Sequence, residues 1–427
     1  MNKIVNEKFN EILFEETLPN GLQVTLIYKP AFVSSSALFA VPYGSLDFQQ
    51  QDGDKIVSVP CGAAHFLEHK MFEDSNKDVM TAFSAMGANV NAFTSYNETV
   101  YYFNTGNKDI SEPLSLLLDF VQQLNIDDES VEKEKGIITQ ELLMYKQMPD
   151  HRLMMEALKS LYHEFPLKYD IVGSEESISD ITLANLTDSY LRNYAPKNMR
   201  LVIVTGEDPE KIFNIVRDNQ ARKEFSEYRF LKRIKYEEPI SCVNDHKIIS
   251  MEVNKTKVCI AYKLKVIEEN SVERSKAEWS LRFLLEAYFT GLNPEYQDWL
   301  DSGVITDYFG YDVDLAKDYA LLMFYNETDD VPTFKKIVEQ QMQVIKTNLI
   351  SEKLLKQLKR RYYGRAVRMF NNINEIGITY VRSMFDDLDI FKSIELINEI
   401  DFSIIKETLP RLELDNHSLI EIRNTEV

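Results

Sequence analysis

Apolar and polar residues are arranged in two different patterns along the first part of the chain, one typical of strands and the other typical of helices. After the turn signal Asn20-Gly21, residues 22–28 alternate in character and predict a strand, and residues 36–41 predict a second one. A polar segment over 49–59 is expected to form a loop that leads into a helix containing His65. The chain therefore begins as a mixture of strands and helices.

The same kind of pattern continues to the end of the chain. Further elements expected in the first half are a helix over 80–86 that ends at Gly87, a β-hairpin over 88–104, a helix over 111–124, a loop over 171–181 and a buried strand over 198–206. In the second half we expect strands at 257–264 and 319–325 and helices at 275–289, 334–348 and 352–370. The second half thus repeats the first in outline.

The length and the change in composition after Gly206 indicate two domains. A chain of 427 residues exceeds what one hydrophobic core normally covers. The segment that follows Gly206 is polar and charged, so we place a boundary near residue 230. This predicts domains at 1–230 and 231–427, each an α/β structure, and an α+β fold class for the whole chain.

Composition excludes several classes of protein. Hydrophobic residues make up 44% of the chain and charged residues 27%, which is typical of a globular protein. A net charge of −20 argues against nucleic acid and membrane partners and would attract cationic peptides, although it can also serve solubility alone. The three cysteines are too few and too widely spaced for a disulfide framework. With no signal peptide or membrane span in the sequence, we expect a cytoplasmic location.

The strongest candidate for chemistry is the string His65-Phe66-Leu67-Glu68-His69. On a helix, residues four apart share a face, so His65 and His69 can bind one metal ion with Glu68 beside them. This order of residues is the inverzincin signature. The alternative is a chance string on a solvated helix face, but the apolar flanks favour a partly buried helix, where histidines need partners.

A second helix is expected to begin after Asp127-Asp128-Glu129, with Ser130 as its N-cap. Glu134 and Glu141 are seven residues apart and therefore lie on one stripe of this helix. Taken alone, they could be two of several surface acids on a charged helix.

These motifs together resemble those of the pitrilysin/insulinase family of zinc metallopeptidases. The resemblance rests on His65-Phe66-Leu67-Glu68-His69, on Asn91-Ala92-Phe93-Thr94, and on Glu134 with Glu141. Within the family the chain is similar to the processing-peptidase-like branch, and more narrowly to the YmfH-like proteins of Gram-positive bacteria. The resemblance implies two homologous α/β domains with antiparallel-rich mixed sheets flanked by helices, which form half of a clamshell peptidase.

The resemblance also implies roles for the residues of the two helices. His65, His69 and Glu141 would bind Zn²⁺, and Glu68 would be the general base. Glu134 would not bind the ion itself but would orient one of the ligands through a hydrogen bond. Two histidines and one glutamate leave zinc an open position, as catalytic sites require. Such a site would hydrolyse peptide bonds, with Glu68 moving the proton.

Substrate binding is expected at the strand that carries Asn91, Ala92, Phe93 and Thr94. This segment resembles the edge strand to which family members add an extended peptide by β-augmentation. Backbone pairing of this kind selects short or unfolded peptides rather than a particular sequence. The alternative is a strand that serves only the sheet.

The second half departs from the family pattern at one position. Members usually carry an arginine seven residues before a tyrosine, and both reach the substrate. Here Tyr308 occupies the tyrosine position, but Asp301 stands where the arginine would be. An aspartate cannot replace the donors of a guanidinium.

The missing arginine affects the expected partners. We expect a heterodimer in which a related, zinc-free subunit supplies the arginine and tyrosine, with pairing of two copies of this chain as a further possibility. The alternative function is a non-enzymatic scaffold or assembly subunit, because the family contains members that have lost the site.

Overall fold

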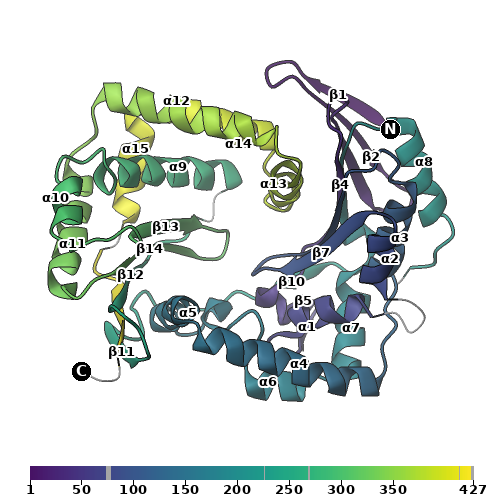
Figure 1. Cartoon of the computed structure of the whole chain (residues 1–427), viewed down its shortest axis with the longest axis horizontal. Coiled ribbons are helices and arrows are strands. Elements are labelled where there is room, and N and C mark those ends of the chain that lie inside the picture. The colour runs from purple at the N-terminus through teal and green to yellow at the C-terminus, as the bar shows by residue number, and fades with distance from the viewer. Residues whose placement is uncertain (74–77, 226, 268–269, 413, 425–427) are drawn as a thin grey trace. The chain divides into compact units, whose positions relative to one another are not determined.

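The computed structural model describes residues 1–73, 78–225, 227–267, 270–412 and 414–424, which fall into two compact units (Figure 1). The units consist of the following segments: Met1–Leu143, Tyr169–Ile234 and Arg368–Asp386 in the first, and Met144–Lys168, Lys235–Val367 and Asp387–Val427 in the second. The units are therefore discontinuous in sequence, whereas the expected domains, 1–230 and 231–427, were continuous. The assignment of those two segments as homologous domains stays a prediction.

The first unit is built on a mixed sheet of seven strands. In spatial order these are β1 (Asn2–Asn6), β2 (Glu11–Thr17), β3 (Gln23–Tyr28), β9 (Arg200–Thr205), β4 (Ser35–Val41), β8 (Thr99–Thr105) and β7 (Ala88–Thr94). Only β3 and β9 pair in parallel, and all other neighbours are antiparallel. The expected antiparallel-rich mixed sheet is confirmed, and β7 forms one of its edges.

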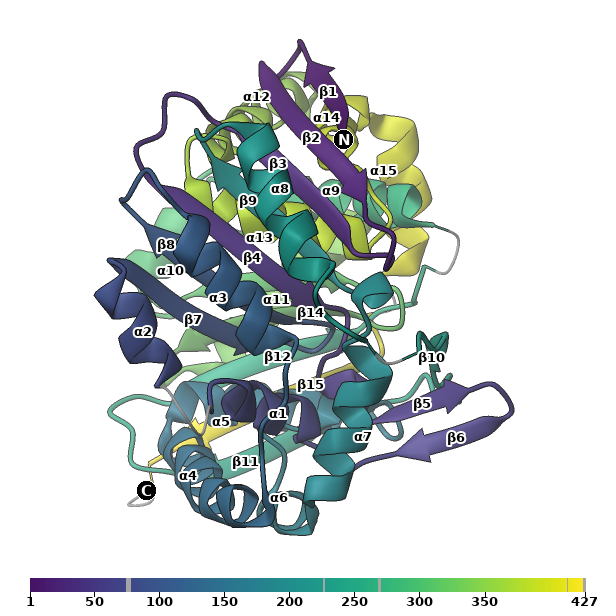
Figure 2. The same cartoon turned by 90° about the vertical axis from the view of Figure 1, so that its right-hand side faces the viewer.

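Helices cover both faces of this sheet, as Figure 2 shows for α3 and α8 on one of them. The helices of the unit are α1 (Ala63–Met71), α2 (Val79–Ala85), α3 (Ser111–Val121), α4 (Asp128–Gln147), α6 (Glu175–Asp180), α7 (Leu183–Asn193), α8 (Pro209–Gln220) and α13 (Ile373–Phe385). The central strands β4 and β9 are buried because they are covered on both sides. Helix α13 packs closely on β4, and a Cβ at Gly377 would lie 2.4 Å from Leu38 Cδ1.

Two segments of the first unit that were expected to be loops contain regular structure. Residues 49–59 are not a loop but contain the hairpin of β5 (Gln49–Asp52) and β6 (Lys55–Ser58), which turns at Gly53 with a φ of +60°. Strand β5 also pairs with β10 (Leu231–Arg233), and the polar composition of the segment concealed the hairpin. The stretch 171–181 was expected to be a loop but holds α6, which the Ser174 side chain caps.

Helix α4 begins earlier than expected, at Asp128. The side chain of Asp127, not that of Ser130, caps it, because Asp127 Oδ1 accepts a hydrogen bond from the Ser130 N–H at 2.8 Å. The acidic first turn suits the positive end of the helix dipole, as the sequence indicated.

The second unit contains a sheet of five strands. Their spatial order is β11 (His246–Ser250), β15 (His417–Arg423), β12 (Lys257–Lys263), β14 (Ala320–Glu327) and β13 (Gly310–Leu315). The helices of this unit are α5 (Pro149–Leu161), α9 (Ser271–Tyr288), α10 (Tyr296–Asp301), α11 (Val331–Thr347), α12 (Glu352–Met369), α14 (Ile390–Glu399) and α15 (Phe402–Thr408). Helix α5 packs on β12 and β15, and α9 packs on β13. Across the described parts of both units, no helix is both long enough and apolar enough to cross a membrane.

Candidate metal centre

Helix α1 carries the two histidines, and a glycine fixes the position of its first residue. Gly62, the residue before the helix, has a φ of +90°, and a Cβ there would lie 2.3 Å from the carbonyl oxygen of Val172. Both the positive φ and the close backbone approach require glycine. Phe66 and Leu67 are fully buried, so the helix is anchored by its apolar side chains while its polar face carries the motif.

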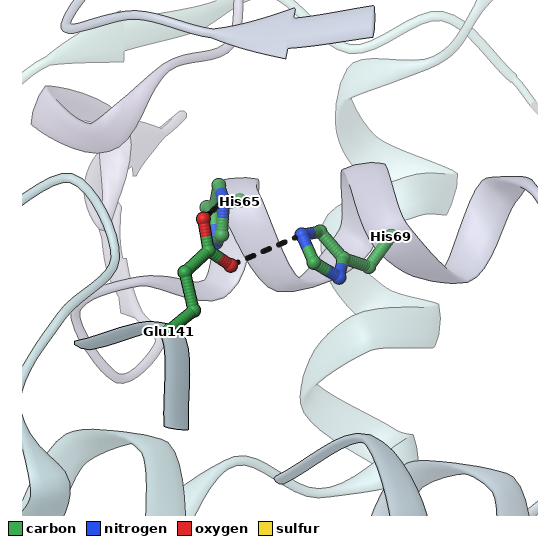
Figure 3. A group of neighbouring side chains, drawn as sticks. All are labelled: His65, His69 and Glu141. Atoms are coloured by element: carbon green, nitrogen blue, oxygen red, sulfur yellow. Dashed lines mark ion pairs between the residues drawn. The ribbon is translucent and has the colours of Figure 1, made fainter. Parts of the chain in front are cut away.

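The structure brings His65, His69 and Glu141 together (Figure 3). Glu141, on α4, places its two carboxylate oxygens 3.8 Å from His65 Nε2 and 3.5 Å from His69 Nε2. One possible ligand atom from each of the three residues lies within 4.8 Å of the other two. All three residues belong to the first unit, and this cluster of two imidazoles and one carboxylate fits a zinc ion with an open position.

Glu134 contacts the other nitrogen of the His69 ring. The distance from His69 Nδ1 to Glu134 Oε1 is 3.0 Å, and Glu134 lies on α4 two turns before Glu141. A histidine that donates Nδ1–H to this carboxylate keeps the Nε2 lone pair free and directed at Glu141. This is the arrangement by which a carboxylate orients a metal-binding histidine.

Burial and charge act differently on the two histidines. Burial, reinforced by the nearby His69, lowers the pKa of His65 to about 3, so His65 is neutral at pH 7 with a lone pair available. Burial alone would also lower the pKa of His69. The hydrogen bond and charge of Glu134, with the charges of Glu141 and Glu68, outweigh burial and raise the pKa of His69.

Glu68 lies beside the histidines and is buried. Its Oε2 accepts a hydrogen bond of 2.6 Å from the Thr94 hydroxyl at the end of β7. Burial raises the pKa of Glu68, although the Thr94 hydrogen bond and His69 oppose the shift. A carboxylate whose pKa is raised in this way is better suited to accept a proton near neutral pH.

The residues expected to bind substrate lie on the edge strand β7. Asn91 is exposed, and Ala92, Phe93 and Thr94 are half-buried. Because β7 pairs only with β8 within the described sheet, its other edge has no strand beside it. The Thr94–Glu68 hydrogen bond places one end of this edge next to Glu68.

Tyr308, also expected to bind substrate, belongs to the second unit, so its place relative to the histidines stays a prediction. Its hydroxyl donates a hydrogen bond of 2.6 Å to Asp150 Oδ1, and Lys257 Nζ lies 4.2 Å from the centre of its ring. Asp301 is exposed at the end of α10 and accepts a hydrogen bond from Gln297.

Sequence reasoning did not predict two of the contacts around this centre. The first is the bond between Thr94 and Glu68, which are 26 residues apart on different elements. The second is the burial of Lys70, whose amine contacts Glu134. A lysine directly after an apolar, buried motif was a signal for the second contact, whereas no pattern in the sequence pointed to the first.

An inverted His-x-x-Glu-His motif on one helix, facing a glutamate on another, defines the inverzincin class of metallopeptidase sites. Comparison with known proteins gives the family. Residues 32–175 match Insulinase (Peptidase family M16), and residues 180–362 match the Peptidase M16 inactive domain. The chain belongs to this family of zinc metallopeptidases.

Individual relatives agree with this assignment. The chain is 33% identical over 405 residues to the uncharacterized zinc protease YmfH of Bacillus subtilis, covering 94% of each chain. It is 28% identical over 200 residues to the mitochondrial-processing peptidase subunit beta of Neurospora crassa, covering 46% of this chain and 40% of that one. The expected resemblance to the YmfH-like proteins is confirmed.

Solved structures confirm the fold. An M16-like peptidase from Alicyclobacillus acidocaldarius superposes with a TM-score of 0.92 at 30% identity, covering 97% of this chain and 99% of that one. A protease from Helicobacter pylori gives a TM-score of 0.82 at 16% identity, covering 96% and 99%. The predicted fold class, two α/β domains of the kind found in clamshell peptidases, is therefore confirmed.

Proposed function

We propose that this chain is a zinc-dependent endopeptidase that cleaves short or unfolded peptides in the cytoplasm. The observation that carries the proposal is the convergence of His65, His69 and Glu141 beside the buried carboxylate of Glu68. The family membership and the names of the relatives, which include zinc proteases, support it.

In this proposal His65, His69 and Glu141 hold Zn²⁺. When bound, the ion polarises the scissile carbonyl and makes an attacking water more acidic. Glu68 takes the proton from the water and delivers it to the leaving amine. Glu134 keeps His69 oriented through its Nδ1, and Thr94 orients Glu68.

The substrate is expected to bind as an additional strand on β7. An extended peptide that pairs with Asn91, Ala92, Phe93 and Thr94 would run past Glu68, since Thr94 bonds to that side chain. Tyr308 is a further proposed substrate contact, as the family pattern implies. Backbone pairing explains why short or unfolded peptides, which have free backbone groups, would be preferred.

We propose further that the active form is a heterodimer with a related, zinc-free subunit. Asp301 stands where an arginine is expected, and no arginine occurs between Gly291 and Tyr319, so this chain lacks that donor. The partner would supply the arginine and a tyrosine. A relative named as subunit beta of a processing peptidase is consistent with a multi-subunit enzyme.

The test measures zinc and cleavage in the same samples. Purified chain is expected to contain about one zinc per molecule and to cleave a quenched peptide, with higher activity after the candidate partner is added. Glu68→Gln should keep the zinc and lose turnover. A zinc-free chain with no activity in the presence of the partner would contradict the proposal and favour a scaffold. Full activity of the chain alone, as a monomer or a homodimer, would contradict the heterodimer.

A further inference from the structure

Lys70 is a fully buried cation directly after the metal-binding motif. Its side chain has 0% relative exposure, although it lies at the end of a short helix. Its amine lies 3.4 Å from Glu134 Oε2, donates a hydrogen bond of 3.1 Å to the Ser130 carbonyl oxygen, and forms an ion pair with Glu73. Burying an ammonium is costly unless it is paired, so these contacts compensate for its desolvation.

The contacts of Lys70 converge on one face of α4. Ser130 and Glu134 are four residues apart and therefore adjacent on the helix surface. By bonding to both, Lys70 ties the end of α1 to the first half of α4, the helix that also carries Glu141. The relative position of the two helices determines the distances among the three candidate ligands.

Glu134 is held at both of its oxygens. Oε2 faces the amine of Lys70 at 3.4 Å, and Oε1 faces His69 Nδ1 at 3.0 Å. The buried amine of Lys70 therefore contacts the carboxylate of Glu134, and this carboxylate contacts the ring of His69. The other nitrogen of that ring, Nε2, faces Glu141. Without the amine, nothing else among these contacts would hold Oε2.

We propose that Lys70 is a positioning residue for the metal centre. It fixes Glu134, and Glu134 in turn fixes the ring orientation of His69, so that Nε2 points to the metal. This inference rests on the proposed function, because it concerns the zinc affinity of that site. Partners that orient metal ligands typically change metal affinity by 10- to 100-fold when they are removed.

The test is a double-mutant cycle read by zinc affinity, measured by competition with a chromophoric chelator. Lys70→Met and Glu134→Gln are each expected to weaken zinc binding by about tenfold or more. In the Glu134→Gln background, Lys70→Met should add less than about twofold, because Lys70 acts through Glu134. Lys133→Met, which removes an exposed charge from α4 next to Glu134, is the matched control and should leave the affinity unchanged.

The outcomes separate this inference from the proposed function. Wild-type chain that does not bind zinc overturns the proposed function. Wild-type chain that binds zinc, with Lys70→Met unchanged or with fully additive effects, overturns only the role of Lys70. Thermal unfolding of the metal-free variants shows whether Lys70→Met is folded. If it is not, Lys70→Gln takes its place, and unchanged affinity in Glu134→Gln alone is enough to reject the inference.

Discussion

His69 is the residue on which the most interactions of the metal centre meet. Its two ring nitrogens face two glutamates of a single helix, Glu134 at 3.0 Å and Glu141 at 3.5 Å. One contact orients the ring, and the other forms part of the candidate donor set. His65 differs because burial dominates its environment and keeps it neutral. Two identical side chains four residues apart thus have different surroundings.

Thr94 is expected to contribute to turnover through Glu68. Thr94→Val removes the 2.6 Å hydrogen bond while keeping the shape of the side chain. We expect kcat to fall by about tenfold, a typical cost for misplacing a general base, with zinc affinity unchanged.

Thr81→Val is the matched control for this variant. Thr81 also donates a hydrogen bond to a carboxylate, that of Asp78 at 2.7 Å, but on an exposed part of α2. Steady-state kinetics give the kcat of both variants for comparison with wild type. Equal effects of the two substitutions would refute a specific role for Thr94.

Glu238 in the second unit predicts a pH dependence of stability. Its carboxylate accepts the backbone N–H groups of His163, Glu164 and Phe165 at 2.7–2.9 Å and pairs with Lys263. Burial alone would raise the pKa of Glu238, but these donors outweigh it and lower the pKa below the ordinary value. Because the folded pKa is the lower one, the contribution is full above the unfolded pKa and is lost as the pH falls through the folded pKa.

We therefore expect Glu238→Gln to lower the free energy of unfolding by about 1–3 kcal/mol at pH 7, and the difference from wild type to shrink below about pH 4.5. Denaturant titrations of both proteins from pH 7 downward measure this difference in the free energy of unfolding. Glu237→Gln, at the exposed neighbouring position, is the control. A difference that stays constant over this pH range would show that the charge of Glu238 is not involved.

At the scale of elements, the contact between α13 and β4 shows why certain small residues are required. Helix α13 comes from late in the chain but packs on the first sheet, and Gly377 lets it approach Leu38. The same helix also reaches β2, because the Tyr380 hydroxyl donates a hydrogen bond of 2.7 Å to Glu15. A late segment is thus built into the core of the first unit.

Gly377→Ala is expected to destabilise the first unit by about 1–3 kcal/mol, because a Cβ at 2.4 Å from Leu38 forces a shift in packing. Gly136→Ala, on α4, is the matched control, since a Cβ there meets no heavy atom within 4 Å. That change should stabilise the helix by up to about 1 kcal/mol. Chemical denaturation of both variants tests the difference, and destabilisation of equal size would contradict the packing argument.

At the scale of the whole molecule, the net charge of −20 affects the rate at which different peptides associate with the protein. An acidic surface raises the local concentration of cationic ligands, and salt screens this attraction. Charge therefore supplements the sequence-independent pairing expected at β7 by favouring basic peptides at the encounter step.

The salt dependence of cleavage tests this idea. For a basic quenched peptide, kcat/KM should fall by at least about threefold between about 50 and 500 mM salt, because the encounter is steered by charge. An uncharged peptide of the same length should change little. If both peptides respond equally to salt, steering by the acidic surface is ruled out.

Several features of this protein could be predicted from the sequence because their causes are local. The spacing of His65 and His69 on one helix follows from the helical period, and the buried strands follow from apolar runs. The resemblance to a known family added Glu141 to the histidines, and the structure brings the three together. The hairpin at 49–58 was missed because the segment is polar and its strands are specified by pairing, β5 with both β6 and β10, rather than by their own composition.

Tertiary structure alone decided the contacts between distant segments. The Thr94–Glu68 and Lys70–Glu134 contacts, and the return of α13 to the first unit, join residues whose sequence separation carries no periodic signal. Such contacts depend on how whole elements pack, and burial determines which polar groups must pair there. The sequence by itself thus determined which residues could bind a metal ion, and the packing of α1 against α4 and β7 decided how those residues are held.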